Sequence, residues 1–179
     1  MLTADGGSAS VSRVRCVASA RVPEDLSEVI RHLESCYPRE GCGVLLRAGA
    51  EGPWRVRPLH NVQDALHASD PVHHPRTSRT AYSFEPREWL AVLTEADARG
   101  EHVACVFHSH VDTEATFSDE DRRQAAPQGQ ILIPGAAYLV MSVHSGCVSD
   151  VRIFWWDCGE FQERPVLPDS WKCQPTDFP

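Results

Sequence analysis

The sequence predicts a mixed α/β (α+β) protein in which helices flank a curved mixed β-sheet. Two stretches carry apolar residues at the spacing of an amphipathic helix, and several short apolar runs have the length of buried strands. These segments follow one another as strand, helix, two strands, helix, strand, helix and further strands, an order typical of helices packed on a sheet. A chain of 179 residues has the size of one domain with a single hydrophobic core.

We divide the chain into three parts. Residues 1–12 are rich in Gly, Ser and Ala and are expected to form a mobile N-terminal segment. Residues 13–166 contain all the periodic segments and form a single folded domain, which begins with a weakly alternating strand over 13–22. Residues 167–179 include three prolines and form an extended C-terminal tail.

The first helix is expected to begin at Pro23 and to end before Pro38, because proline suits a helix start and restricts the residue before it. Its apolar stripe consists of Leu26, Val29, Ile30 and Leu33. Strands over Cys42–Leu46 and Trp54–Leu59 follow, and we expect them to pair as a hairpin.

The segment 60–80 is polar and lacks periodicity, which predicts a long loop that is either functional or disordered. Its histidine pair, His73-His74, is either solvent-exposed or a second metal site. A second helix begins at Glu85-Pro86 and ends at Gly100. The apolar residues that we place on one face of this helix are Trp89, Leu90, Leu93 and Ala96.

The remaining elements alternate between apolar strands and one short helix. We expect a buried strand over 101–107, a helix over 118–126, a central strand over 136–143, a strand over 151–156 and an edge strand over 161–166.

Composition excludes several classes of protein. The formal net charge of −8 argues against a nucleic-acid-binding surface, which needs a basic patch. No signal peptide is visible at the start, and no run approaches the length of a membrane span, so we expect no membrane association. Seven scattered cysteines without a C-x-x-C pair favour a cytoplasmic protein with reduced thiols.

The most informative motif is His108-Ser109-His110, followed by Ser118 and Asp121. Residues two apart on a strand point to the same face, so both imidazoles can reach one metal ion. Asp121 adds a carboxylate from the start of the short helix. Two imidazoles and a carboxylate suit a catalytic zinc whose fourth position is left for water.

The same residues also allow a structural interpretation. Ser118 and Asp121 fit a capping box, in which a serine and an acid satisfy the first amides of a helix. This role does not exclude metal binding by Asp121, because a helix start can fix the position of a ligand. Ser109 faces the other side of the strand, which favours a structural role.

The pattern H-S-H-x7-S-x2-D resembles the signature of the JAMM (MPN-plus) metalloprotease family. That family also has an upstream glutamate, and Glu40 occupies the matching position in Tyr37-Pro38-Arg39-Glu40-Gly41-Cys42-Gly43. The resemblance extends from about residue 24 to about residue 156 and is greatest to short, single-domain prokaryotic members. Val111 and Phe117 stand where many relatives have proline, which concerns the loop and leaves the polar positions intact.

The resemblance implies an MPN/cytidine-deaminase-like architecture for a catalytic domain that holds Zn²⁺ through His108, His110 and Asp121. It implies Glu40 as general base and Ser118 as a stabiliser of the oxyanion. The implied partner is a ubiquitin-like or sulfur-carrier protein, cut after its C-terminal Gly-Gly, with the segment 60–80 as a flap over that tail. Without the resemblance Glu40 reads as an exposed turn residue.

Two other functions stay open. The first is a non-catalytic module that binds a ubiquitin-like protein and keeps a vestigial zinc. The second is a cupin-type metal oxygenase, because His108-x-His110-x3-Glu114 with His144 downstream fits part of the cupin pattern. Against the cupin, position 102 is histidine instead of glycine, and that fold is an all-β barrel.

Overall fold

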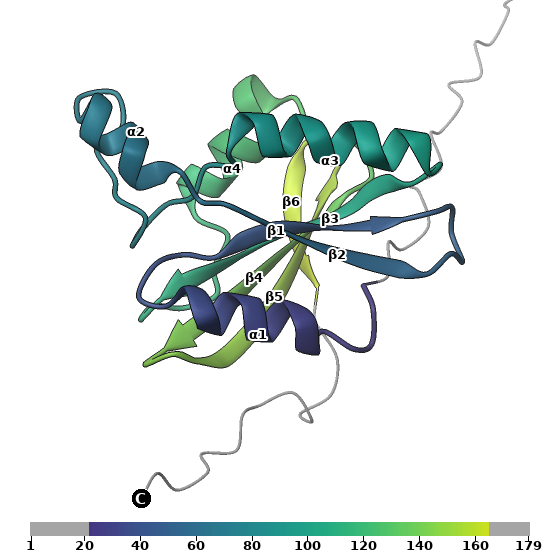
Figure 1. Cartoon of the computed structure of the whole chain (residues 1–179), viewed down its shortest axis with the longest axis horizontal. Coiled ribbons are helices and arrows are strands. Elements are labelled where there is room, and N and C mark those ends of the chain that lie inside the picture. Colours follow the sequence, from purple (N-terminus) through teal and green to yellow (C-terminus); the bar gives the residue numbers. More distant parts are fainter. Residues whose placement is uncertain (1–21, 165–179) are drawn as a thin grey trace, which may run out of the picture.

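The computed structural model describes residues 22–164 (Figure 1). The segments expected over 1–12 and 167–179, and all but the last residue of the strand expected over 13–22, lie outside this range. Within it, no helix combines the length and the apolar character that crossing a membrane requires.

A single six-stranded sheet forms the centre of the structure, with the strand order β2-β1-β3-β4-β5-β6. Neighbouring strands are antiparallel except for the central pair β3 and β4, which is parallel. The mixed sheet with flanking helices confirms the predicted fold class. The strands are β1 (Cys42–Arg47), β2 (Trp54–Leu59), β3 (His102–Val111), β4 (Ala137–His144), β5 (Cys147–Asp157) and β6 (Glu160–Arg164).

Helices cover both faces of this sheet (Figure 1). Helix α1 (Ser27–Cys36) packs on one face through Leu26, Val29 and Leu33, which are fully buried as predicted. It begins four residues later than Pro23, where the Asp25 carboxylate accepts a hydrogen bond from the Ser27 amide. Helices α3 (Pro86–Ala98) and α4 (Asp119–Ala125) lie on the opposite face.

The buried face of α3 differs from the prediction. Val92 and Ala96 are buried and Trp89 packs beside them, whereas Leu90 and Leu93 are 65% and 38% exposed. The helix carries apolar residues on two adjacent faces, and helical spacing fits both. The position of the sheet decides between them, and the sequence of the helix alone does not contain that information.

The segment 60–80 is not a continuous loop, because it contains helix α2 (Gln63–Ser69). Gln63 is the only buried residue of this helix. Its amide donates to Asn61 Oδ1 at 3.0 Å, and its Nε2 donates to the Arg76 carbonyl at 2.9 Å. Helix α2 is attached through these polar bonds and has no buried apolar stripe. Hydrophobic periodicity could therefore not reveal this helix.

Candidate metal centre

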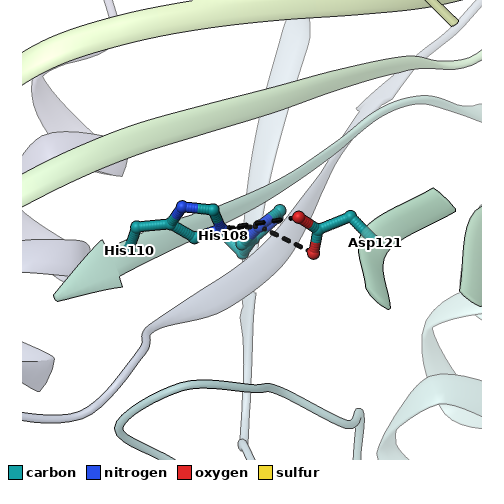
Figure 2. Close-up of side chains that lie close together, drawn as sticks. All are labelled: His108, His110 and Asp121. Carbon is teal, nitrogen blue, oxygen red and sulfur yellow. Dashed lines mark hydrogen bonds and ion pairs between the residues drawn. The ribbon is translucent and has the colours of Figure 1, made fainter. Parts of the chain in front are cut away.

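Three of the predicted site residues meet near the end of β3. His108 and His110 are 0% and 7% exposed, and strand alternation directs both side chains to the face covered by α3 and α4. Asp121 approaches from the first turn of α4 and is also buried. Figure 2 shows its carboxylate pointing at the two imidazoles.

The distances between these side chains match those around a tetrahedral ion. His108 Nε2 lies 3.2 Å from His110 Nε2 and 3.2 Å from Asp121 Oδ1, and His110 Nε2 lies 3.4 Å from Asp121 Oδ2. An ion with bonds of about 2.0–2.1 Å has tetrahedral ligand atoms about 3.3–3.4 Å apart. The three side chains are therefore close enough together to hold one small metal ion.

The protonation states also suit a metal. His110 Nδ1 lies 2.9 Å from the Glu114 carbonyl, which can only accept, so Nδ1 carries a hydrogen, and Nε2 is the ring nitrogen that faces Asp121 and can bind a metal ion. Burial alone would raise the pKa of Asp121, but His108, His110 and Ser118 outweigh it and hold that pKa well below its ordinary range. Asp121 is thus an ionised carboxylate beside His110 Nε2.

Ser118 and Asp121 form the predicted capping box of α4. The Ser118 amide and hydroxyl donate to Asp121 Oδ2 at 2.7 and 2.6 Å, and the Asp121 amide donates to Ser118 Oγ at 3.2 Å. These bonds fix the Asp121 carboxylate in place next to the imidazoles. The capping interpretation is confirmed, and it is compatible with metal binding by Asp121.

Glu40 lies in the turn between α1 and β1 and is only 5% exposed, which contradicts its interpretation as an exposed turn residue. Its amide donates to the Ser78 carbonyl at 2.7 Å, and its carbonyl accepts from Asn61 Nδ2 at 2.9 Å. Burial raises the pKa of the Glu40 carboxyl to about 8, His110 opposes this shift and Asp121 adds to it. The carboxyl therefore lies close enough to both metal-ligand candidates to respond to their charges.

Ser109 connects the Glu40 turn to the strand that carries the histidines. It is fully buried; its hydroxyl accepts from the Gly41 amide at 2.9 Å, and its amide donates to the Gly41 carbonyl at 3.0 Å. A Cβ on Gly41 would lie only 2.8 Å from Leu33 Cδ2, so a side chain here would press the turn away from α1. No local pattern reveals this connection, because the two residues are 68 positions apart.

Tyr82 is a second neighbour that the sequence did not reveal. Its ring stacks on the His108 imidazole with 4.6 Å between centroids and 28° between planes. Tyr82 is itself buried, so it supports His108 from the side of α3 and excludes water there. A single tyrosine in an irregular segment gives no sequence signal for such a role.

Two alternative metal sites are not supported. The His73 side chain is 78% exposed, and its Nδ1 lies 2.7 Å from Asp70 Oδ2. Glu114 is exposed and contacts His110 only through its backbone carbonyl, and the open sheet with helices is not a cupin barrel. Across residues 22–164, one group could hold a metal ion, and it consists of His108, His110 and Asp121.

Comparisons with known proteins agree with this arrangement. A family model for prokaryotic homologs of the JAB domain matches residues 23–157. A desampylase from Haloferax volcanii is 30% identical over 157 residues, covering 87% of this chain and 96% of the relative. A CysO-cysteine peptidase from Mycobacterium tuberculosis is 28% identical over 141 residues, covering 79% and 84%.

Solved structures give the same result for the fold. A protein from Desulfitobacterium hafniense superposes with a TM-score of 0.56 at 26% identity, covering 79% of this chain and 86% of that one. A protein from Salinibacter ruber has a TM-score of 0.50 at 25% identity and covers 85% and 94%.

Proposed function

The chain belongs to the prokaryotic JAB family, and we propose that it is a zinc-dependent peptidase or isopeptidase. It hydrolyses the amide bond after the C-terminal Gly-Gly of a ubiquitin-like or sulfur-carrier protein. The names of two relatives, desampylase and CysO-cysteine peptidase, support this class of reaction and partner. The observation that carries the proposal is the convergence of His108, His110 and Asp121 beside the buried Glu40.

His108, His110 and Asp121 are the residues that hold Zn²⁺ in this proposal. Two imidazole nitrogens and one carboxylate oxygen are typical ligands of a catalytic zinc and leave one position open. When bound, the zinc ion supplies Lewis acidity: it lowers the pKa of a water molecule toward about 7 and polarises the scissile carbonyl.

Glu40 is the general base in this reaction. Its carboxylate takes a proton from the attacking water and later gives it to the leaving amine. A general base works best with a pKa near the working pH, and burial already raises the pKa of Glu40 to about 8. Glu40 becomes a stronger acid when positive charge lies nearby, so metal loading brings its pKa closer to neutral.

Ser118 is the proposed oxyanion donor. Its hydroxyl lies within hydrogen-bond distance of Asp121 Oδ2, which places it at the rim of the metal-ligand group. A hydroxyl at this place can turn toward the carbonyl oxygen of the substrate as negative charge develops there. One such donor contributes about 10²- to 10³-fold in rate.

Intact mass spectrometry tests the proposal. Candidate Gly-Gly-tailed proteins with short C-terminal extensions are incubated with the protein, with added zinc or with a chelator. We expect loss of the extension only when zinc is present. If no Gly-Gly-tailed protein is shortened by the zinc-loaded protein, the peptidase assignment is wrong.

The non-catalytic binding module is the second candidate, and Glu40→Gln distinguishes it from the enzyme. If the protein is an enzyme, the variant still binds zinc and the partner protein but no longer cleaves the substrate. If the protein is a binding module, the variant behaves like the unmodified protein, because no proton transfer is involved.

A cytoplasmic location stays a prediction.

A further inference from the structure

Arg76 lies in a turn that is fastened to the backbone of Glu40. The turn comprises residues 76–80, between α2 and α3, and its Ser78 carbonyl accepts the Glu40 amide at 2.7 Å. Gln63 Nε2 donates to the Arg76 carbonyl at 2.9 Å, and the Arg76 Nη1 donates to the Thr80 carbonyl at 3.1 Å. These bonds fix where the Arg76 side chain leaves the turn.

The charge of Arg76 affects the pKa of two acidic residues, Glu40 and Glu120. It is among the charges that oppose the rise in the pKa of Glu40, which burial causes. It also contributes to the lowered pKa of Glu120 in the first turn of α4, where Arg123 is the main cause. The Arg76 charge therefore lies within electrostatic range of both the Glu40 carboxyl and the start of the helix that carries Asp121.

Arg76 differs from its neighbour Arg79 in one respect. Arg79 Nη2 lies 3.7 Å from Asp112 Oδ2, whereas Arg76 is exposed and forms no ion pair within 4.0 Å with any residue of the described part of the chain. Arg76 is thus a cation that is held on the turn bonded to the Glu40 backbone, and its charge is available to a ligand.

In the proposed reaction, the leaving group of the substrate lies next to Glu40. Glu40 gives its proton to the leaving amine nitrogen, so the leaving group sits on the side of the site where Glu40 and Arg76 are. If the leaving group is a single amino acid, its α-carboxylate is separated from that nitrogen by one carbon atom. Two carboxylates so close together repel each other unless a cation lies between them or beside them.

We propose that Arg76 binds the free α-carboxylate of a single amino acid joined to the Gly-Gly tail of the carrier protein. This inference rests on the proposed peptidase function and names its leaving group. Water adds to the terminal glycine carbonyl, the C–N bond breaks, and the products are the carrier carboxylate and a free amino acid with both its charges. A guanidinium can bind a carboxylate through two parallel hydrogen bonds.

The alternative leaving group is a protein joined through a lysine side chain. In that case a chain of methylenes follows the scissile nitrogen, and no carboxylate lies near Glu40. Arg76 would then gain nothing from the leaving group. A role for Arg76 in binding the leaving group is therefore expected for release of an amino acid and not for cleavage of an isopeptide bond.

Two substrates that differ only in one charge test the inference. A ubiquitin-fold carrier ending in Gly-Gly is extended by one alanine, either with a free carboxylate or as the carboxamide, and kcat/KM is measured for both with the zinc-loaded protein. We expect the unmodified protein to prefer the free acid by roughly tenfold to a hundredfold, the range of a charged hydrogen bond.

Variants of Arg76 test whether this residue causes the preference for the free acid. In Arg76→Gln we expect the acid-to-amide ratio to fall to about one, and in Arg76→Glu to fall below one, while Arg76→Lys keeps part of it. Arg79→Gln is the matched control from the same turn and keeps the full ratio. Zinc content and thermal unfolding of each variant exclude a loss caused by misfolding.

Two results overturn the inference while leaving the peptidase proposal intact: no acid preference in the unmodified protein, or an unchanged preference in Arg76→Gln. A different result, in which neither extended carrier is cut by the zinc-loaded protein, rejects the proposed function and the carboxylate site together.

Discussion

The two halves of the candidate site are built in opposite ways. His108, His110 and Asp121 belong to one strand–loop–helix segment, and the strand alternation and the capping box fix them locally. Glu40 lies in a distant turn, which depends on bonds from Asn61, Ser78 and Ser109. The metal ligands can therefore stay in place when Glu40 moves, and we expect metal binding and turnover to be separable.

Glu40→Gln is expected to have the largest effect on turnover. The amide has nearly the same shape but cannot accept the proton, so kcat should fall by about 10²- to 10⁴-fold. Zinc content should stay at the level of the unmodified protein, because Glu40 is not one of the three ligands. Steady-state kinetics and elemental analysis measure the two quantities.

Glu114→Gln is the matched control for this variant. The Glu114 side chain is exposed, and only its backbone carbonyl contacts His110. We expect normal kinetics. Loss of zinc in Glu40→Gln would contradict the separation of the two halves.

Ser118→Ala should reduce kcat by roughly 10²- to 10³-fold if the hydroxyl stabilises the oxyanion. It also removes the helix cap, which costs about 1 kcal/mol of stability. Ser118→Thr keeps a hydroxyl and should therefore retain part of the kcat and part of the stability that Ser118→Ala loses. If alanine lowers stability but leaves kcat unchanged, Ser118 is only a cap and a support for Asp121.

Ser109→Ala tests the link between the halves. It leaves the buried Gly41 amide without its acceptor, which costs about 1–3 kcal/mol, and it loosens the Glu40 turn. We expect kcat to fall on the order of tenfold while zinc affinity is kept.

Ser142→Ala is the control for this effect. Ser142 is a buried serine on the neighbouring strand β4, and its hydroxyl donates to the Thr113 carbonyl and not to the Glu40 turn. It should lower stability without the change in kcat. Equal kinetic effects of the two variants would mean that Ser109 does not position Glu40.

The last prediction concerns the stability of the metal-free protein, and no effect on turnover is involved. Glu40 has an ordinary pKa of 4.5 and a folded pKa of about 8, so between these values the folded state binds more protons than the unfolded state. The free energy of unfolding should therefore decrease as the pH rises from about 4.5 to about 8. Asp121 acts in the opposite sense: its pKa is lowered, so its contribution is present above 3.8 and is lost as the pH falls below that value.

Denaturant unfolding in a chelator at pH 5 and pH 8 measures this dependence. Glu40→Gln should reduce the difference between the two pH values, because glutamine does not titrate. A difference of the same size in both proteins would assign the pH dependence to other groups.

The contrast between the halves also explains how much the sequence could predict. The histidine pair and the capping box follow from spacing within one segment, and the order of strands and helices follows from periodicity. Glu40 was assigned only through the resemblance to a family, because nothing near it in the sequence indicates burial or the contact with Ser109. Helix α2 and the burial of Val92 in place of Leu90 depend on tertiary contacts that local patterns do not contain.

A crystal structure of the zinc-loaded protein with anomalous data at the zinc edge tests the central claim most directly. We predict one strong peak within about 2.0–2.2 Å of His108 Nε2, His110 Nε2 and an Asp121 carboxylate oxygen, with Glu40 facing the fourth position and not bonded to the ion. A peak elsewhere, or no peak in protein that still cleaves its substrate, would contradict the account.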